Sequence, residues 1–135
     1  MNAYSVQQSS DGGYIFTGQS GGYAWLVKTD ADGSEMWNKT FKGKNSSSAY
    51  SVRQTLIGSY IIGGWTKKNQ SNDYYGWLIK ADSNGNKQWD KIFEKFDEYY
   101  TLDAQQTMNA GYIFTYRKIY QTVKLSGQTL DYHGS

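Results

Sequence analysis

The chain contains no cysteine and no proline, and it lacks a marked excess of charge of either sign. The absence of cysteine excludes disulfides and thiolate metal sites in any compartment. With 14 Lys and Arg against 12 Asp and Glu, the 135 residues carry a net charge of +2, without the basic run that would favour nucleic-acid binding. No segment approaches the about 18 consecutive apolar residues of a membrane helix, and residues 1–8 lack the charged start and apolar core of a signal peptide. We therefore expect no nucleic-acid partner, no membrane partner and no signal peptide, while the compartment stays open.

Residue types suited to catalysis or metal binding are also scarce. His133 is the only histidine, so a Ser-His-Asp or Cys-His mechanism would depend on that one residue. One histidine without cysteine argues against a zinc site. The segments that begin at Asp30 and Asp82 resemble the opening of a calcium loop, but the second has Phe93 where such a loop needs an acidic residue, and we interpret both as turns. We expect no enzyme, no metal and no cofactor.

Aromatic residues and glycine are abundant instead. Phe, Trp and Tyr make up 17% of the chain, with 13 Tyr and 5 Trp, and glycine numbers 15. Tyrosine and tryptophan favour pleated, half-buried surfaces, and glycine favours tight turns. No window shows helical periodicity over more than one turn. This composition predicts an all-β protein of short strands.

One unit occurs three times along the chain. Tyr4–Gly18 aligns with Tyr50–Gly64 and with Leu102–Tyr116. The second half of the unit, Trp25–Trp37, aligns with Trp77–Trp89, and the third copy keeps only a degenerate version without tryptophan. Each unit predicts four strands, at about 3–9, 13–19, 23–29 and 34–41 in the first copy, separated by Asp-Gly and Gly-Gly turn signals.

The sequence pattern predicts that the strands are covered on both faces of their sheets. Segments such as Tyr60-Ile-Ile and Trp77-Leu-Ile are continuously apolar, whereas a half-exposed sheet would alternate. Four-stranded units of this period predict a single repeat domain, 1–135, of three β-propeller blades at about 3–48, 49–98 and 99–135. Because propellers have about 4 to 8 blades, we expect a second chain to complete a six-bladed ring as a homodimer. The alternative is a β-trefoil, which closes three four-stranded units within one chain.

The repeat resembles a known family. Ala-Tyr-Ser-Val-Gln-Gln-x-x-Asp-Gly-Gly-Tyr-Ile, followed by Trp-Leu-Val-Lys-Thr-Asp-x-Asp-Gly-x-x-x-Trp, is similar to the tandem-repeat β-propeller proteins of archaea and bacteria, and distantly to quinoprotein-type propeller repeats. The resemblance implies a propeller fold and proteins that are often extracellular or surface-bound. It implies nothing about chemistry, because the matching residues are the structural ones.

Binding, if present, is expected from aromatic and amide side chains. The first strand of each copy carries a glutamine, and a ring of amides could bind sugar hydroxyls or instead bond to the backbone of its own blade. Aromatic residues near strand ends or loops offer flat apolar faces with polar edges. A lysine at the same position of each copy is expected to pair with the acid two residues later, Lys28 with Asp30 and Lys80 with Asp82. The candidate ligand-binding residues are Tyr74, Tyr75, Trp65, Tyr23, Gln8, Gln54 and Gln106.

The leading hypothesis is a non-enzymatic module that recognises a glycan or a protein through these aromatics on a propeller scaffold. The alternative is a structural or self-assembling unit without a small ligand, in which the same aromatics form the seam between chains. Alanine substitutions at Tyr74 and Tyr75 distinguish the two, since they would remove binding in one case and assembly in the other.

Overall fold

A computed structural model shows an all-β chain, as the composition predicts. The structure describes the backbone of residues 1–43, 45–68, 73–96, 103–106, 112–116, 119–126 and 129–134, and side chains only as far as residue 93. These residues contain no helix. All the recorded strand pairings are antiparallel.

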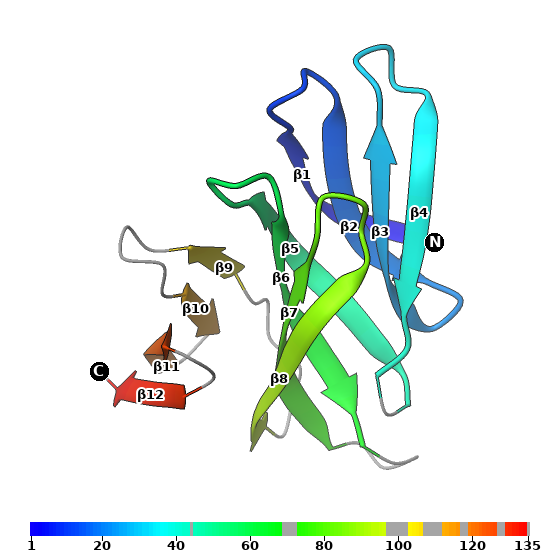
Figure 1. The fold of residues 1–135 in the computed structure, drawn as a ribbon. Helices are drawn as coiled ribbons and strands as arrows, with labels where there is room; N and C mark the ends of the chain where they lie inside the picture. The colour runs from blue at the N-terminus through cyan, green and yellow to red at the C-terminus, as the bar shows by residue number, and fades with distance from the viewer. Residues whose placement is uncertain are drawn as a thin grey trace.

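Consecutive strands form four-stranded sheets (Figure 1). The first sheet contains β1 (Asn2–Gln8), β2 (Tyr14–Ser20), β3 (Tyr23–Thr29) and β4 (Glu35–Phe41), close to the predicted strands. The second sheet contains β5 (Ser47–Gln54), β6 (Tyr60–Lys67), β7 (Tyr74–Ala81) and β8 (Lys87–Phe96). Backbone pairing joins β9 (Asp103–Gln106), β10 (Tyr112–Tyr116), β11 (Ile119–Ser126) and β12 (Thr129–Gly134) in a further sheet.

The first two sheets follow the same plan in detail. The first strand of each has a bulge at the same position, between Ala3 and Ser5 in β1 and between Ala49 and Ser51 in β5. The turns after β3 and β7 are also alike, because Gly33 and Gly85 adopt φ of 86° and 84°, which favours glycine. The sequence repeat is therefore also a repeat of backbone geometry.

The core lies between the first two sheets. Ile15, Leu26 and Phe41 of the first sheet pack against residues of the second that include Ile62 and Trp77. Alternation along β2 and β3 directs these first-sheet residues to one face and their sequence neighbours to the other. Only one face of the first sheet is thus covered by the rest of the described chain.

The second sheet lies between the other two in Figure 1, and β9 lies against β5 and β6. On this side of the second sheet Ile61, Leu78 and Phe93 are buried. Each described sheet is made of four consecutive strands, so the strands do not combine into the single closed barrel that the β-trefoil alternative requires.

Candidate functional site

The candidate site is the outward face of the first sheet. Cross-strand pairing places Val6, Phe16 and Val27 side by side on β1, β2 and β3. Trp25 lies two residues from Val27 on the same face, and its ring contacts Phe16 edge-on with centroids 5.6 Å apart. The face is therefore an apolar surface built by the central strands.

In the second sheet, the equivalent surface is covered. Val52, Tyr60, Ile62, Trp77 and Ile79 occupy the matching repeat positions, and all five are buried against the first sheet. In the first sheet the same face is open along β1 and at the start of β2: Val6 is 67% exposed where Val52 is 2%, and Tyr14 is 38% exposed where Tyr60 is 1%. Val27 on β3 is only 2% exposed, like its counterpart Ile79 at 1%.

A cavity of about 260 Å³ lies on the open face, at the bulge of β1. It is lined by Ala3, Tyr4, Ser5, Val6 and Phe16.

At the matching place in the second sheet, the first sheet supplies the occupants. The Tyr4 ring lies 4.7 Å from the Tyr50 ring, and Ser5 Oγ accepts a hydrogen bond from Val52 N at 3.4 Å. The cavity of the first sheet is thus the equivalent of a site in the second sheet that residues of the first sheet fill.

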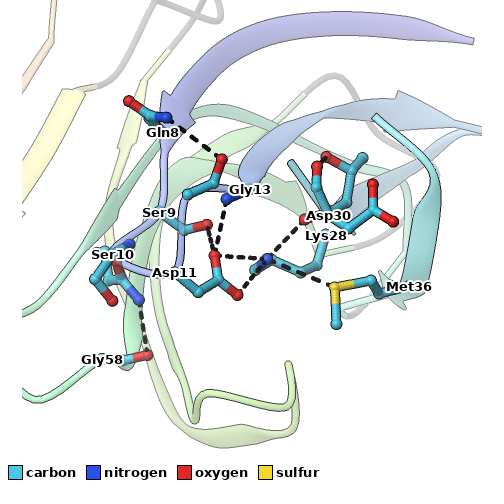
Figure 2. Close-up of polar contacts among 12 residues, drawn as sticks. Gln8, Ser9, Ser10, Asp11, Gly13, Lys28, Asp30, Met36 and Gly58 are labelled. Atoms are coloured by element: carbon cyan, nitrogen blue, oxygen red, sulfur yellow. Dashed lines mark hydrogen bonds and ion pairs between the residues drawn. The ribbon is translucent and has the colours of Figure 1, made fainter. Parts of the chain in front are cut away.

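Glutamine side chains join the two sheets at the turn end. Gln54 N donates to Gln7 Oε1 at 2.7 Å, and Gln54 Oε1 accepts from Ser10 N at 2.7 Å. The amide nitrogens of Gln54 and Gln8 each donate to a carbonyl in their own turn, at 3.4 and 3.3 Å (Figure 2). These bonds are of the backbone-bonding kind weighed for the glutamines, and Gln54 adds a bond between sheets. The side chain of Gln106 lies outside the described residues.

Trp37 packs closely against the second sheet. A Cβ built on Gly85 would lie 2.5 Å from the Trp37 ring and 2.9 Å from Lys39 Cγ. The indole of the first sheet therefore packs against the bare backbone of the β7–β8 turn, where no other residue type leaves room. The Tyr60 ring lies edge-on to the same indole, at 6.2 Å between centroids.

A buried lysine is held at the β1–β2 turn (Figure 2). Lys28, whose side chain is 5% exposed, forms an ion pair with Asp11 Oδ2 at 3.0 Å and donates to Thr29 O at 2.7 Å. The expected pairs Lys28–Asp30 and Lys80–Asp82 are wrong. Asp30 Oδ1 instead accepts from two backbone amides in its own turn, and Lys80 Nζ donates to Gln88 Oε1. The carboxylates are taken up by their turns because short Asp side chains reach nearby backbone amides more readily than a lysine two residues back.

The pKa of Asp11 lies well below its ordinary value. Hydrogen bonds from the Ser9 hydroxyl, the Gly13 amide and Lys28 all favour the charged carboxylate. The pKa of Asp82 is also lowered, chiefly by the backbone amide of Asn86 in its turn.

Replacing Asp11 with asparagine should destabilise the fold at neutral pH, because the buried Lys28 ammonium loses its anionic partner. A folded pKa below the unfolded value of about 3.9 contributes stability above that pH, and the contribution is lost as the pH falls through the folded value. The difference in denaturant midpoint between wild type and D11N should therefore be constant from pH 8 to pH 5 and shrink below about pH 4. A difference that stays constant down to pH 2 would contradict this assignment.

A polar cavity of about 350 Å³ opens beside this network, between the first two sheets. Its lining includes Asp11, Lys28, Trp37, Gln54 and Tyr60. Burial, together with the charge of Asp11, raises the pKa of the Tyr60 phenol. Because Lys28 and Asp11 form an ion pair with each other, neither offers the cavity a free charge that could bind a ligand.

The predicted aromatic residues lie at the opposite end of the sheets. Trp65 is 6% exposed, donates from Nε1 to the Tyr50 hydroxyl at 3.2 Å and meets the Tyr74 ring edge-on at 4.8 Å. Lysine ammonium groups lie over the half-buried tyrosine rings, Lys67 over Tyr74 at 4.8 Å. The other two such pairs are Lys68 over Tyr75 at 4.4 Å and Lys42 over Tyr23 at 5.6 Å. Trp65 and Tyr74 are thus brought together, Tyr23 lies at the same end on the first sheet, and Gln8 and Gln54 lie at the other end. Ligand binding by these residues stays a prediction.

Within the part of the chain with described side chains, no group of three His, Cys, Asp or Glu is placed to hold a metal ion. The described residues also include no helix long and apolar enough to cross a membrane.

The chain was compared with known proteins. No family model matches it, and no curated protein matches its sequence.

Proposed function

We propose that this chain is a non-enzymatic module that binds a protein partner through the open face of its first sheet. The observation that carries the proposal is the contrast between equivalent residues: Val6 is 67% exposed and Val52 2%. A contiguous apolar surface rimmed by polar residues is typical of a protein interface. The repeat adds that this particular face, in its second copy, is covered by protein.

We propose further that the sheets are propeller blades. Successive four-stranded antiparallel meanders that pack face to face are the arrangement expected of blades. The resemblance to tandem-repeat propellers supports the same view. A ring needs both end faces covered, so the open face of the first sheet is the place where such a ring would continue.

A protein partner is favoured over a glycan by the surroundings of the aromatic residues. Sugar rings stack on free aromatic faces, but lysines lie over the Tyr74 and Tyr75 rings. Exposed Val6 and half-buried Phe16 and Trp25 form an apolar surface instead, which suits another protein better than a sugar.

Photo-crosslinking tests the proposal. A benzophenone side chain at Val6, on the open face, should cross-link a defined protein in an extract of the source cells, identified by mass spectrometry. The same group at Leu56, which is 91% exposed in the β5–β6 turn and away from that face, serves as the control and should give at least about tenfold less product.

Competition makes the result specific. Excess unlabelled wild type should suppress the Val6 product, whereas excess Phe16→Lys should not, because a charge on the apolar face opposes docking. Equal yields from Val6 and Leu56, or equal competition by the two proteins, would refute binding at this face.

A further inference from the structure

We infer that the partner on the open face is another four-stranded repeat of this chain's own type, whose tryptophan packs over Gly33. This inference rests on the proposed function, since it names the partner of the same face. It follows from an interface that the structure already contains, between the first and second repeats.

The contact of Trp37 with Gly85 is the template. Gly85 is buried because the indole lies on it, and a Cβ there would overlap the ring at 2.5 Å. The two residues occupy fixed places in the motif, since each of the first two repeats has its turn glycine four residues before its tryptophan. One repeat therefore donates the indole and the next repeat receives it at its glycine.

Gly33 holds the repeat position of Gly85, but no described indole packs against it. Its turn has the hydrogen bonds of the Gly85 turn, from Gly33 N to Asp30 O at 3.1 Å and from Gly85 N to Asp82 O at 2.9 Å. A Cβ on Gly33 would meet no described heavy atom within 4 Å, and the residue is exposed.

The polar contacts of the template are also available on the open face. Gln54 Oε1 accepts a hydrogen bond from the backbone of the neighbouring repeat, at Ser10 N. Among the described residues none donates to the matching atom, Gln8 Oε1. In the second sheet, the place beside Tyr50 is occupied by the Tyr4 ring of the first sheet. The cavity beside Tyr4 is the equivalent place in the first sheet, so a docking repeat would fill it with its own tyrosine.

A second copy of this chain has no free sheet with the required tryptophan. Its first repeat already uses Trp37 on Gly85. The strand register pairs Lys28 with Trp37 and Lys80 with Trp89, whereas the equivalent pair in the last repeat is Lys124 with Asp131. The last repeat therefore has aspartate at the donor position, and also Thr122 at the position of Leu26. The partner we infer has a tryptophan and a leucine at these two positions.

The chain can be given such a partner by adding a second copy of residues 1–46 before residue 1. The added copy supplies the tryptophan, and the original first repeat is the receiving repeat. Because the sequence has no cysteine, a Val6→Cys substitution in the receiving repeat introduces a unique thiol for alkylation. We expect iodoacetamide to modify this thiol at least about tenfold more slowly than in the unduplicated Val6→Cys chain. The docked repeat covers the thiol, so the thiol reacts only in molecules whose added repeat has transiently undocked.

The matched variants are Gly33→Asn and Gly12→Asn in the receiving repeat. Both glycines have positive φ, of 86° and 87°, and empty surroundings, and asparagine tolerates this conformation better than other side chains. Only Gly33 corresponds to Gly85. A Cβ on Gly58, the counterpart of Gly12, would meet only the Gln54 side chain of its own turn among the described atoms. Gly33→Asn should restore rapid alkylation, and Gly12→Asn should leave the protection in place.

Should the duplicated chain fail to fold, Thr122→Leu/Asp131→Trp in the single chain provides the second test. This variant should double its molar mass in sedimentation equilibrium and lose the doubling when Gly33→Asn is added. Absence of protection and of mass doubling, or protection that survives Gly33→Asn, would overturn the inference.

If the unduplicated Val6→Cys chain dimerises and its thiol is protected with or without Gly33→Asn, the inference is also overturned, since a second copy would then be the partner. The proposed function fails separately, when Val6 cross-links nothing. A cross-linked protein together with an undocked duplicate would remove the inferred partner and leave the interaction role intact.

Discussion

Replacing Trp77 with alanine is expected to lower the free energy of unfolding by about 3–5 kcal/mol. Trp77 is 2% exposed, belongs to the core between the first two sheets and donates from its indole nitrogen to Asp90 Oδ2 at 2.8 Å. Its loss leaves a cavity that sheet-to-sheet packing cannot readily close. Urea unfolding followed by circular dichroism measures the change.

Trp25→Ala is the matched control, because Trp25 holds the same repeat position on the open face and is only half-buried. It should cost clearly less than Trp77→Ala, since less apolar surface returns to water. Equal costs would show that the first sheet is covered in solution by something that the isolated chain provides, which would contradict the open face.

Gly85→Asn is expected to cost about 1–3 kcal/mol, because the new Cβ must displace the Trp37 ring. Asparagine accommodates a φ of 84° better than other side chains, so the cost reports the lost indole contact more than backbone strain. The same urea experiment measures it.

Gly33→Asn supplies the reference for that measurement. Its turn has the same conformation and no neighbour within 4 Å of the added Cβ, so the effect of asparagine on the turn itself is common to both variants. The difference between the two isolates the contact with Trp37. A Gly33→Asn chain as unstable as Gly85→Asn would mean that the indole contributes nothing to the interface.

These two results also test the proposed function. If Trp77 and Gly85 are costly to change and Trp25 and Gly33 are not, the same repeat positions are filled in one sheet and vacant in the other. That asymmetry is the physical basis for a binding face, because the apolar area left in water is recovered only when a partner covers it.

The strands and turns could be predicted because they depend on local patterns. Asp-Gly and Gly-Gly turns and continuous apolar segments located β1 to β4 to within one residue of their ends. Recognition of the repeat then carried the assignment into the second sheet.

The polar contacts could not be predicted in the same way. Lys28 was expected to pair with its near neighbour Asp30, but the chain brings Asp11 from the adjacent turn to within 3.0 Å. A signal was present in the sequence, since the first repeat has aspartate at position 11 where the second has Ile57 and pairs its lysine differently. The lysines over Tyr74 and Tyr75 were missed because the sequence does not say which side of a ring remains free.

The sequence by itself determined that the chain is all-β, that it is built from one recurring four-stranded unit, and that each unit has two apolar faces, because strand periodicity and turn chemistry are local properties. Only the tertiary structure decided which of these equivalent faces is covered. Residues with matching neighbours along the chain, such as Val6 and Val52, differ in exposure because packing depends on whether another sheet lies opposite, and no local pattern encodes that.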